Sequence, residues 1–385
     1  MRLLHVVASY LPAVRYGGTI VSVHALCKAL AARGHDVHVF TTSVDGPRDS
    51  AVPHGDAVAI DGVSVWYFQS RYLRRLYWSP PLGKALAARA AGFDVVHTHG
   101  VFLWPLWVAA RAATRAGVPH VLSPRGMLEH ELVEARSTVL KRLWIATIEK
   151  RNVEQAAAIH VTSKREADEL AQFGFRLPPV REVPNGVDPQ PRTQGAPASA
   201  AVASLVNAGP FLLFLGRLNW KKGLDRLIAA LPHAPGVRVV VAGNDEDGYR
   251  RVLEAQAARL GVTDRITFAG AVFDADKTAL IAAAEALVLP SYSENFGNVV
   301  LEAMAAGRPV IVTPEVGLAS VVERTGAGVV AEGTPTALAS AIVTMMSEPS
   351  RRRAMGERGR QAAADLTWPA VAAQMEALYQ SVLRA

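Results

Sequence analysis

Two glutamates eight residues apart stand where a predicted strand gives way to a predicted helix. Glu294 lies in the polar loop after the apolar run Ala286–Leu289, and Glu302 lies in the helical pattern that follows Gly297. Eight residues of helix rise about 12 Å, so the two carboxylates can bind separate parts of one extended ligand. A nucleotide-sugar has this shape, with one carboxylate at the ribose hydroxyls, the other at the sugar hydroxyls, and the diphosphate between them.

The backbone at the start of this helix offers a place for the diphosphate. Amides near Asn298 and Val299 lack partners within the helix, and a helix N-terminus attracts anions. Glutamates at this spacing are also common on solvated helices. Here, however, the helix is apolar and follows a buried strand, which favours a binding site over a surface position.

Further groups suited to phosphate follow two other predicted strands. Arg217 and Lys222 flank a short loop after Phe211–Gly216, where two fixed cations can neutralise a departing diphosphate. Near the start of the chain, Gly17 and Gly18 stand between a strand and a helix. They either serve a turn or let the backbone approach a phosphate closely. No G-x-G-x-x-G or Walker A pattern is present, so the signature of dinucleotide or ATP binding is absent from the sequence.

Two more strand ends carry histidines and an arginine. His97 and His99 end the predicted strand Phe93–His99 and share one face, while Arg125 follows the predicted strand His120–Ser123. The carboxyl ends of parallel strands are where α/β sheets place ligands, so we expect His99 to line a site. Arg125 would hold a phosphate or form a surface ion pair. Two histidines without a third ligand make no zinc site, and we therefore expect no metal.

Length and composition predict two domains of the α/β class. The 385 residues are 50% hydrophobic, and strands alternate with helices, which predicts parallel sheets. A stretch rich in proline, alanine and serine, 189–210, predicts a linker or long loop. It would separate a first domain, 1–188, from a second, 211–366, with a last helix over 367–385.

The net charge and the absence of targeting segments limit where the protein is expected to be located and what it is expected to bind. The net charge of +7 favours phosphates, acidic lipid surfaces or nucleic acid as partners. Cys27 is the single cysteine, so no intramolecular disulfide can form and a reducing compartment is expected. No signal peptide is evident, and the longest apolar run, Val101–Ala110, is too short to span a bilayer. We expect a cytoplasmic protein that can contact the inner face of the plasma membrane.

Two basic, aromatic segments bear on that membrane contact. The helical pattern Glu131–Gln155 either lies on anionic lipid or buries one face in the core. The segment Arg71–Lys84 interleaves arginines with Tyr72, Tyr77 and Trp78, and we expect a surface loop that packs these aromatics on the body. Lipid and nucleic acid are the alternative partners of this segment.

In their order along the chain, these motifs resemble those of retaining glycosyltransferases of the GT-B fold, family 4. The motifs are the glycine loop, H-x-H, Asn185-Gly-Val-Asp188, the G-R…K-G element and E-x7-E, and they span essentially the whole chain. The resemblance implies two Rossmann-like, doubly wound domains facing across a cleft. The first domain would hold the acceptor and the second most of the nucleotide-sugar, with the last helix crossing back onto the first.

The resemblance also implies a role for each candidate residue. The catalytic group would be His99 at the donor sugar, Arg217 and Lys222 at the diphosphate, and Glu294 at the sugar hydroxyls. Arg125 would lie on the acceptor side. Donor contacts would come from Gly17, Gly18, Val272, Lys277, Asn295, Phe296, Gly297, Asn298, Val299 and Glu302, with Val272 and Lys277 at the base and Glu302 at the ribose.

In the family the leaving phosphate takes the acceptor proton, so neither a nucleophilic carboxylate nor a metal or cofactor is expected. The D-x-D strings at 245–247 and 274–276 are interpreted as exposed loops.

The function implied is a retaining, metal-independent hexosyltransferase. It would move a sugar from a UDP- or GDP-linked donor to a hydroxyl of a glycan or lipid-linked acceptor, in the assembly of bacterial exopolysaccharide or lipopolysaccharide. A related GT-B epimerase or phosphorylase is an alternative, and so is a non-catalytic protein that binds glycan or a membrane surface. Nucleic-acid binding would explain the charge but none of the motifs, so it is not expected.

Overall fold

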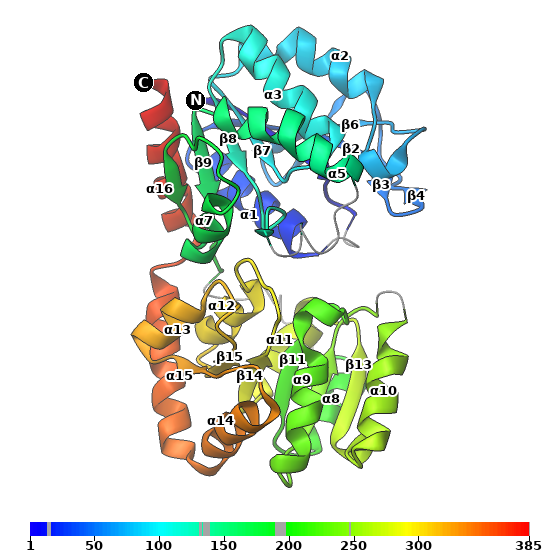
Figure 1. Ribbon diagram of the computed structural model, residues 1–385, viewed down its shortest axis with the longest axis vertical. Coiled ribbons are helices and arrows are strands. Elements are labelled where there is room, and N and C mark those ends of the chain that lie inside the picture. Colours follow the sequence, from blue (N-terminus) through cyan, green and yellow to red (C-terminus); the bar gives the residue numbers. More distant parts are fainter. Residues whose placement is uncertain (14–16, 131–132, 134–138, 189–197, 246–247, 385) are drawn as a thin grey trace. The chain divides into compact units, whose positions relative to one another are not determined.

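The computed structural model describes residues 1–13, 17–130, 133, 139–188, 198–245 and 248–384. The chain divides into two compact units. Unit 1 comprises Met1–Gly186 and Trp368–Ala385, and unit 2 comprises Val187–Thr367. Each unit is a parallel or nearly parallel sheet with helices packed on both faces, as Figure 1 shows. The predicted α/β class with two Rossmann-like domains is confirmed.

Within the described residues, unit 1 has an eight-stranded sheet with the order β10-β9-β8-β7-β1-β2-β6-β5. Only β5 is antiparallel to its neighbour. A separate hairpin pairs β3 (Val44–Asp45) with β4 (Arg48–Asp49). The strands of the large sheet are β1 (Arg2–Ser9), β2 (Asp36–Thr42), β5 (Ala57–Ile60), β6 (Val63–Phe68), β7 (Val95–His99), β8 (His120–Ser123), β9 (Ala158–Val161) and β10 (Val180–Glu182).

Strand β1 is buried on both faces because helices cover each side of the sheet. Its residues Leu3 and Val7 pack with α1 and α16, whereas Leu4 and Val6 pack with α2 and α3. This two-sided burial is why the strand appears in the sequence as an unbroken apolar run. The helices of unit 1 are α1 (Gly18–Ala32), α2 (Pro80–Arg89), α3 (Trp104–Ala116), α5 (Val139–Trp144), α6 (Lys150–Glu154), α7 (Lys164–Ala171) and α16 (Trp368–Leu383), with a π-helical turn at Ile145–Glu149 between α5 and α6.

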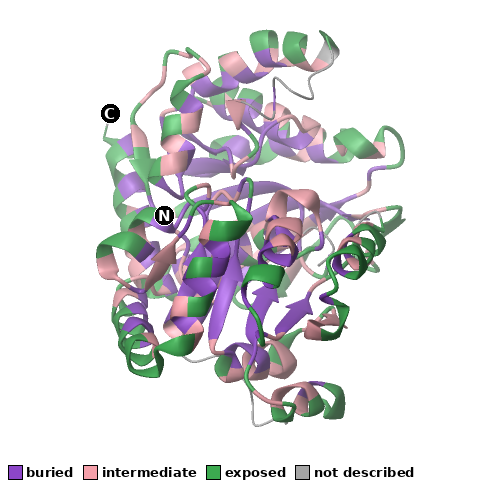
Figure 2. Cartoon of the chain, turned by 60° about the horizontal axis from the view of Figure 1, so that its bottom comes forward, coloured by how far each residue is buried: buried purple, intermediate pink, exposed green. Residues whose placement is uncertain are grey.

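Unit 2 has a six-stranded, all-parallel sheet with the order β13-β12-β11-β14-β15-β16 in the part of the chain that the structure describes. Strands β11, β12, β14 and β15 are buried throughout, whereas β13 and β16, at the two ends of the sheet, are partly exposed. In Figure 2 the purple, buried residues lie mostly on strands and the green, exposed residues mostly on helices and loops. The strands are β11 (Leu212–Leu215), β12 (Val239–Ala242), β13 (Ile266–Gly270), β14 (Ala286–Leu289), β15 (Val310–Val312) and β16 (Gly328–Val330). The helices are α8 (Ala200–Asn207), α9 (Leu224–Ala230), α10 (Tyr249–Arg259), α11 (Asp274–Ala283), α12 (Asn298–Ala305), α13 (Ala319–Thr325), α14 (Pro335–Ser347) and α15 (Pro349–Ala364).

Two predictions about irregular segments were wrong. Part of the predicted linker forms α8, whose first turn is capped because the Ser199 hydroxyl accepts a hydrogen bond from Val202 N at 3.3 Å. Asp274 and Asp276, predicted as loop, occupy the first turn of α11, where carboxylates interact favourably with the helix dipole.

Three predicted segments fall partly outside the described residues. These are the linker at 189–197, the other D-x-D string at 246–247, and the basic helix at 131–132 and 134–138. Among the described helices, none combines the length and the apolar character that crossing a bilayer requires.

A close backbone approach joins two neighbouring loops of unit 2. Gly223 follows the 3-10 turn Trp220–Lys222 with a φ of +65°, and a Cβ at this position would lie 1.9 Å from Pro290 O. Only glycine allows both this conformation and this distance. The turn after β11 is therefore packed directly against the end of β14.

We expect Gly223→Ala to destabilise unit 2 much more than the matched change Gly261→Ala. Both glycines have a φ of +65°, but a Cβ at 261 meets nothing within 4 Å. Backbone strain alone should cost about 1 kcal/mol at 261, and strain plus overpacking about 3 kcal/mol at 223. Urea unfolding curves would measure both. Equal losses would contradict the close packing.

Candidate functional site

The loop between β14 and α12 is held by backbone hydrogen bonds on two sides. Tyr292 N donates to Lys221 O at 2.8 Å. On the other side, Glu294 N donates to Glu315 O at 3.1 Å, and Gly317 N donates to Glu294 O at 2.8 Å. The first glutamate of the predicted pair is thus fixed in place through its own backbone, at the carboxyl edge of the sheet.

Arg226 supports the same loop through its side chain. Its guanidinium donates to Ser291 O at 3.2 Å and lies 3.6 Å from the ring centre of Tyr292. The Tyr292 hydroxyl in turn donates to Asp225 Oδ2 at 2.8 Å. Sequence reasoning missed Arg226, because its partners are backbone carbonyls more than sixty residues away and leave no local pattern.

Each glutamate of the pair has a lysine partner. Lys222 forms an ion pair with Glu294, and Lys277 Nζ lies 2.7 Å from the carboxylate of Glu302. The side chains are 21% and 16% exposed in the first pair and 34% and 28% exposed in the second. Lys222 was predicted as a catalytic residue at the diphosphate and Lys277 as a donor contact at the base, but the pairing was not predicted. A ligand with hydroxyls for the carboxylates and phosphates for the lysines could replace both pairs.

The N-terminus of α12 opens beside Glu294. Gly297 precedes the helix with a φ of +95° and has no side chain of its own to cap the first turn. Asn298 and Val299 are partly exposed there. Phe296 is 3% exposed in the core of unit 2, and its carbonyl accepts from Leu318 N at 3.0 Å, so neither group is open to a ligand.

The remaining predicted positions of unit 2 lie around the same edge. Arg217 is exposed directly after β11, the strand that pairs with β14. Val272 is partly buried against the core between β13 and α11, and Asn295 is partly exposed in the loop itself. The structure thus places Arg217 and the two Lys–Glu pairs at the ends of neighbouring elements.

In unit 1, one face of the sheet carries a chain of hydrogen-bonded imidazoles. His5 on β1 lies in register with His97 on β7. His5 Nδ1 is 2.9 Å from His99 Nε2, and the Arg125 guanidinium is 3.1 Å from His99 Nδ1. Because a guanidinium can only donate, His99 Nδ1 must accept and His99 Nε2 must donate to His5.

A second chain of contacts starts at the backbone and ends on the C-terminal helix. His160 Nε2 lies 2.9 Å from Val183 O and therefore donates to it. His160 Nδ1 can then accept from His97 Nε2 at 3.4 Å, and His97 Nδ1 accepts from the Tyr379 hydroxyl at 2.7 Å. These contacts assign a neutral tautomer to each ring.

Burial keeps these imidazoles uncharged near neutral pH. Desolvation, helped by the nearby Arg125, lowers the pKa of His5 to about 3 and of His160 to about 3. The pKa values of His97 and His99 are held well below 6.5, first by burial. His99 is 2% exposed with both ring nitrogens engaged. A sugar could bond its ring only by displacing one of these contacts.

His5 supplies the third histidine that sequence reasoning did not find. One nitrogen each of His5, His97 and His99 lies within 4.8 Å of the others, a spacing that a metal ion could use. The signal was a histidine in the middle of β1, but its meaning depends on β1 and β7 being neighbours. Because the rings bond one another and Arg125 adds a positive charge, we interpret the cluster as a hydrogen-bond network.

Arg125 is held at the end of β8 by neutral partners. Its guanidinium donates to His99 and to Asn185 Oδ1, the latter at 3.0 Å, and it forms no ion pair with any described residue. Its φ of +56° is unusual for a residue with a side chain. The adjacent amide, Gly126 N, donates to the buried Glu166 at 2.7 Å and fixes the turn. The predicted alternative of a surface ion pair was wrong.

Gly17 and Gly18 stand at the start of α1, also in unit 1. Gly17 has a φ of +76°, a conformation that favours glycine, and Gly18 is the first residue of the helix. The N-cap residue Gly17 has no side chain to cap this helix start, so its first amides are suited to an anion.

Two family models match the chain. The model of glycosyltransferase family 4 covers residues 16–191, and the model of glycosyl transferases group 1 covers residues 200–362. A glycogen synthase of Mycobacterium tuberculosis is 30% identical, over 100% of this chain and 95% of the relative. A D-inositol 3-phosphate glycosyltransferase of Xylanimonas cellulosilytica is 29% identical, over 94% of this chain and 91% of the relative.

Solved structures share the fold over the whole length. Sucrose-phosphate synthase of Thermosynechococcus elongatus has a TM-score of 0.78 at 24% identity and covers 100% of both chains. HepE of Anabaena, in complex with UDP and glucose, has a TM-score of 0.76 at 22% identity, over 99% of this chain and 100% of that one. Both are GT-B glycosyltransferases, so the predicted GT-B fold is confirmed.

We expect the stability of unit 1 to fall as the pH falls below about 6.5. Above that pH the buried histidines are neutral in both folded and unfolded chains. Below it, the unfolded chain binds protons that the folded network excludes, at up to about 1.4 kcal/mol per pH unit for each histidine. The free energies of unfolding measured in urea at pH 7.5 and at pH 5.5 should differ by about 2–5 kcal/mol, with the lower value at pH 5.5.

Two substitutions make this measurement specific to the network. His160→Gln should reduce the difference between the two pH values, because one of the excluded protons is gone. His54→Gln, at an exposed position, should leave it unchanged. Equal stability of the parent protein at both pH values would contradict the neutral network.

Proposed function

Because the chain belongs to glycosyltransferase family 4, with its second half matching the model of glycosyl transferases group 1, we propose that it moves a sugar from a nucleoside-diphosphate sugar to an acceptor hydroxyl. The observation that carries this proposal is the arrangement of Lys222–Glu294 and Lys277–Glu302 at the carboxyl edge of the unit 2 sheet. It offers cations for phosphate and carboxylates for hydroxyls within one site.

On binding, the donor would exchange each ion pair for contacts of its own. Lys222 would turn to the diphosphate together with Arg217, leaving Glu294 to accept hydrogen bonds from the sugar hydroxyls. Glu302 would bind the ribose diol beside the base. A partly buried carboxylate without a partner costs free energy, so each glutamate can release its lysine only when a hydroxyl of the ligand takes the lysine's place.

Retention at the anomeric carbon fits a site in which no carboxylate is free to attack. Glu294 is fixed by its backbone and, with the donor bound, would be engaged by the sugar hydroxyls, which suits orientation better than nucleophilic attack. The leaving phosphate would take the acceptor proton, and the lysine and arginine would stabilise the charge that develops on it. With these cations in place, the reaction needs no divalent metal.

A UDP-sugar is the donor that we favour over a GDP-sugar, because the HepE structure contains UDP at a similar fold. For the acceptor, the partly buried Arg125 offers a cation that has no acidic partner among the described residues. This favours an acceptor that carries a phosphate, as the names of the inositol-phosphate and sucrose-phosphate relatives also suggest. Lipid-linked glycans of exopolysaccharide or lipopolysaccharide assembly are one such class.

Two alternatives predict different outcomes. An epimerase or phosphorylase on the same fold would consume its sugar substrate without forming a second glycosidic product. A non-catalytic binding protein would bind the nucleotide and turn over nothing.

We expect substitutions of the two glutamates to weaken the binding of different ligands. Glu302→Gln should weaken UDP and UDP-sugar alike, because the ribose is common to both. Glu294→Gln should weaken only the UDP-sugar, because it would contact the sugar. Each affected affinity should fall at least tenfold, about 1.4 kcal/mol, in calorimetric titrations.

The titrations should include GDP-, ADP- and TDP-sugars to identify the base. Glu254→Gln is the matched control, since Glu254 also pairs with a cation, Arg250, but on the surface of α10. If Glu254→Gln lost as much affinity as Glu302→Gln, the assignment of Glu302 to the ribose would be wrong. Failure of every nucleotide to bind would remove the proposed donor site itself.

We also expect the product to keep the anomeric configuration of the donor. Proton NMR of the freshly formed glycoside would report the configuration, and added EDTA should leave the rate unchanged. An inverted product, or activity lost with EDTA and restored by a divalent metal, would overturn this part of the mechanism.

A further inference from the structure

Two segments of unit 1 expose large apolar side chains. In the loop around the 3-10 turn Arg74–Leu76, Tyr72 is 70% exposed and Leu73 is 64% exposed. On α5, Val139 is 85% exposed and Leu143, one turn later on the same helix face, is 58% exposed. The sequence prediction that Tyr72 packs on the body was wrong.

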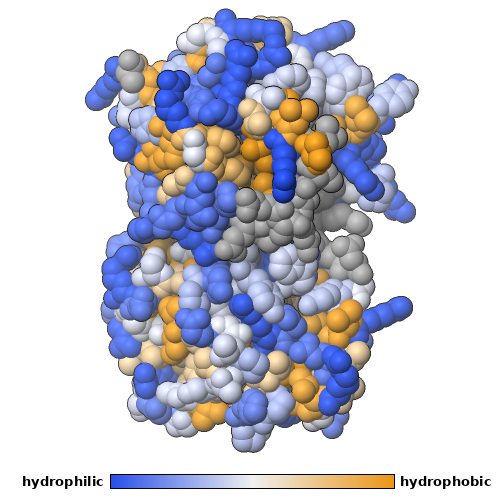
Figure 3. Space-filling view, viewed as in Figure 1, coloured by the Kyte–Doolittle hydropathy of each residue, from blue (hydrophilic) through white to orange (hydrophobic). Residues whose placement is uncertain are grey.

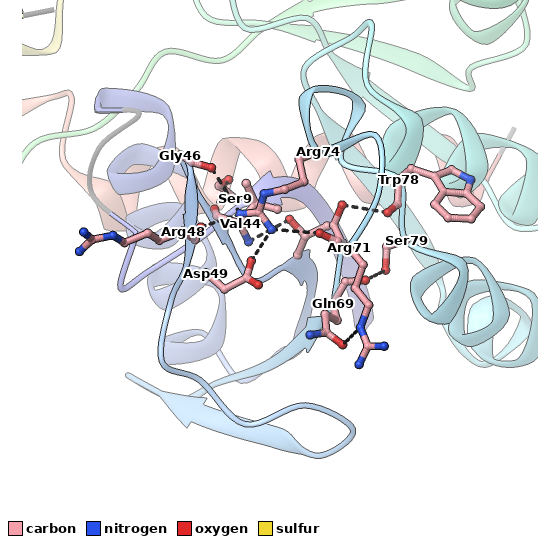
Figure 4. A network of polar contacts seen from close by, with 12 residues as sticks. Ser9, Val44, Gly46, Arg48, Asp49, Gln69, Arg71, Arg74, Trp78 and Ser79 are labelled. Atoms are coloured by element: carbon pink, nitrogen blue, oxygen red, sulfur yellow. Dashed lines mark hydrogen bonds and ion pairs between the residues drawn. The ribbon is translucent and has the colours of Figure 1, made fainter.

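The exposed loop is held in place by Arg74. Its guanidinium donates to Asp49 Oδ1 at 2.9 Å and to three backbone carbonyls, those of Ser70 at 3.0 Å, Gly46 at 3.3 Å and Arg48 at 2.7 Å (Figure 4). Arg74 thus anchors the loop through its side chain, while Tyr72 and Leu73 beside it are exposed.

Four tryptophans connect the loop to α5. Trp78 in the loop contacts Trp104 with ring centres 6.4 Å apart, and Trp107, one turn further along α3, contacts Trp144 on α5 at 6.4 Å. All four are only partly buried. Tryptophan favours the boundary between water and lipid, where its ring is in contact with apolar chains and its N–H with polar groups.

Cations surround these aromatic and apolar residues. Arg71 and Arg75 are exposed in the loop, and Arg142 is exposed on α5. Lys141 lies 4.8 Å from the ring centre of Phe102. The sequence from Arg71 to Lys84 contains no acidic residue. In Figure 3, hydrophobic and hydrophilic side chains lie side by side over the part of unit 1 that holds α5.

We propose that this surface, formed by the loop at 71–78, the start of α3 and α5, docks unit 1 onto an anionic lipid bilayer. Tyr72, Leu73, Val139 and Leu143 enter the boundary between headgroups and acyl chains, while the arginines bind lipid phosphates. The inference rests on the proposed function for its biological purpose, because a lipid-linked acceptor would be reached at a membrane. Its physical basis is independent of catalysis.

The test is sedimentation of the full-length protein with vesicles, without donor or acceptor. Phosphatidylcholine vesicles containing phosphatidylglycerol should bind the protein, and phosphatidylcholine alone should bind it weakly. Tyr72→Ser/Leu73→Ser and Val139→Ser/Leu143→Ser should each lower partitioning about tenfold. Arg71→Gln/Arg75→Gln should lower it by a similar factor, with an effect that disappears at high salt.

Val252→Ser is the control, because Val252 is 58% exposed on α10 of unit 2. It should leave partitioning unchanged. Brominated lipids should quench the tryptophan fluorescence of the parent protein, and the double variants should lose that quenching. Circular dichroism would verify that each variant is folded.

Three outcomes would overturn the proposal. The parent protein could fail to bind acidic vesicles. The Val252→Ser control could lose as much vesicle partitioning as the double variants. Alternatively, the double variants could abolish a concentration-dependent dimer and leave lipid binding intact, which would make the surface a protein interface. Since nucleotide titration is a separate measurement, each of these outcomes leaves the proposed transferase activity standing.

Discussion

The backbone of the loop between β14 and α12 is bonded to its neighbours on both sides, and the site in unit 2 depends on this constraint. Tyr292 is joined to the turn after β11, and Glu294 to the turn before α13. Carboxylates and lysines on long side chains need such a frame, because catalysis by orientation fails when the groups are misplaced by about 1 Å. Arg226 adds further support, because its guanidinium bonds to Ser291 O and lies against the ring of Tyr292 in this loop.

Much of this half could be predicted from the sequence because its signals are local. Strand β14 appears as an apolar run ending at Pro290, and α12 begins directly after Gly297, as the pattern indicated. Parallel strands covered on both faces produce such runs, and glycine marks the change of direction. The choice of Glu294, Glu302, Lys222 and Lys277 followed from the same motifs and the family resemblance, and the structure brings them together as two pairs.

What could not be predicted depends on contacts between distant segments. Lys222 and Glu294 are 72 residues apart, so their pairing becomes visible only when β11 and β14 lie side by side. The role of His5 in the histidine network can be recognised only once β1 and β7 are known to be neighbours. The anchoring of the exposed loop by Arg74 likewise depends on Asp49, 25 residues away. The helix α8 lies in a stretch whose composition is typical of linkers, but Val202 buries itself against the unit 2 core and so stabilises the helix.

The placement of α16 has a consequence for how the protein is made. Unit 1 contains the first residues of the chain, yet its core includes Met375 and Tyr379 near the end, and His97 Nδ1 has its partner in Tyr379. A growing chain therefore leaves part of one face of the unit 1 sheet uncovered until α16 has been synthesised. Unit 2 is continuous in sequence and can fold while that face still waits for its last helix. On the ribosome, unit 2 can therefore complete its core before unit 1 does, although most of unit 1 is synthesised first.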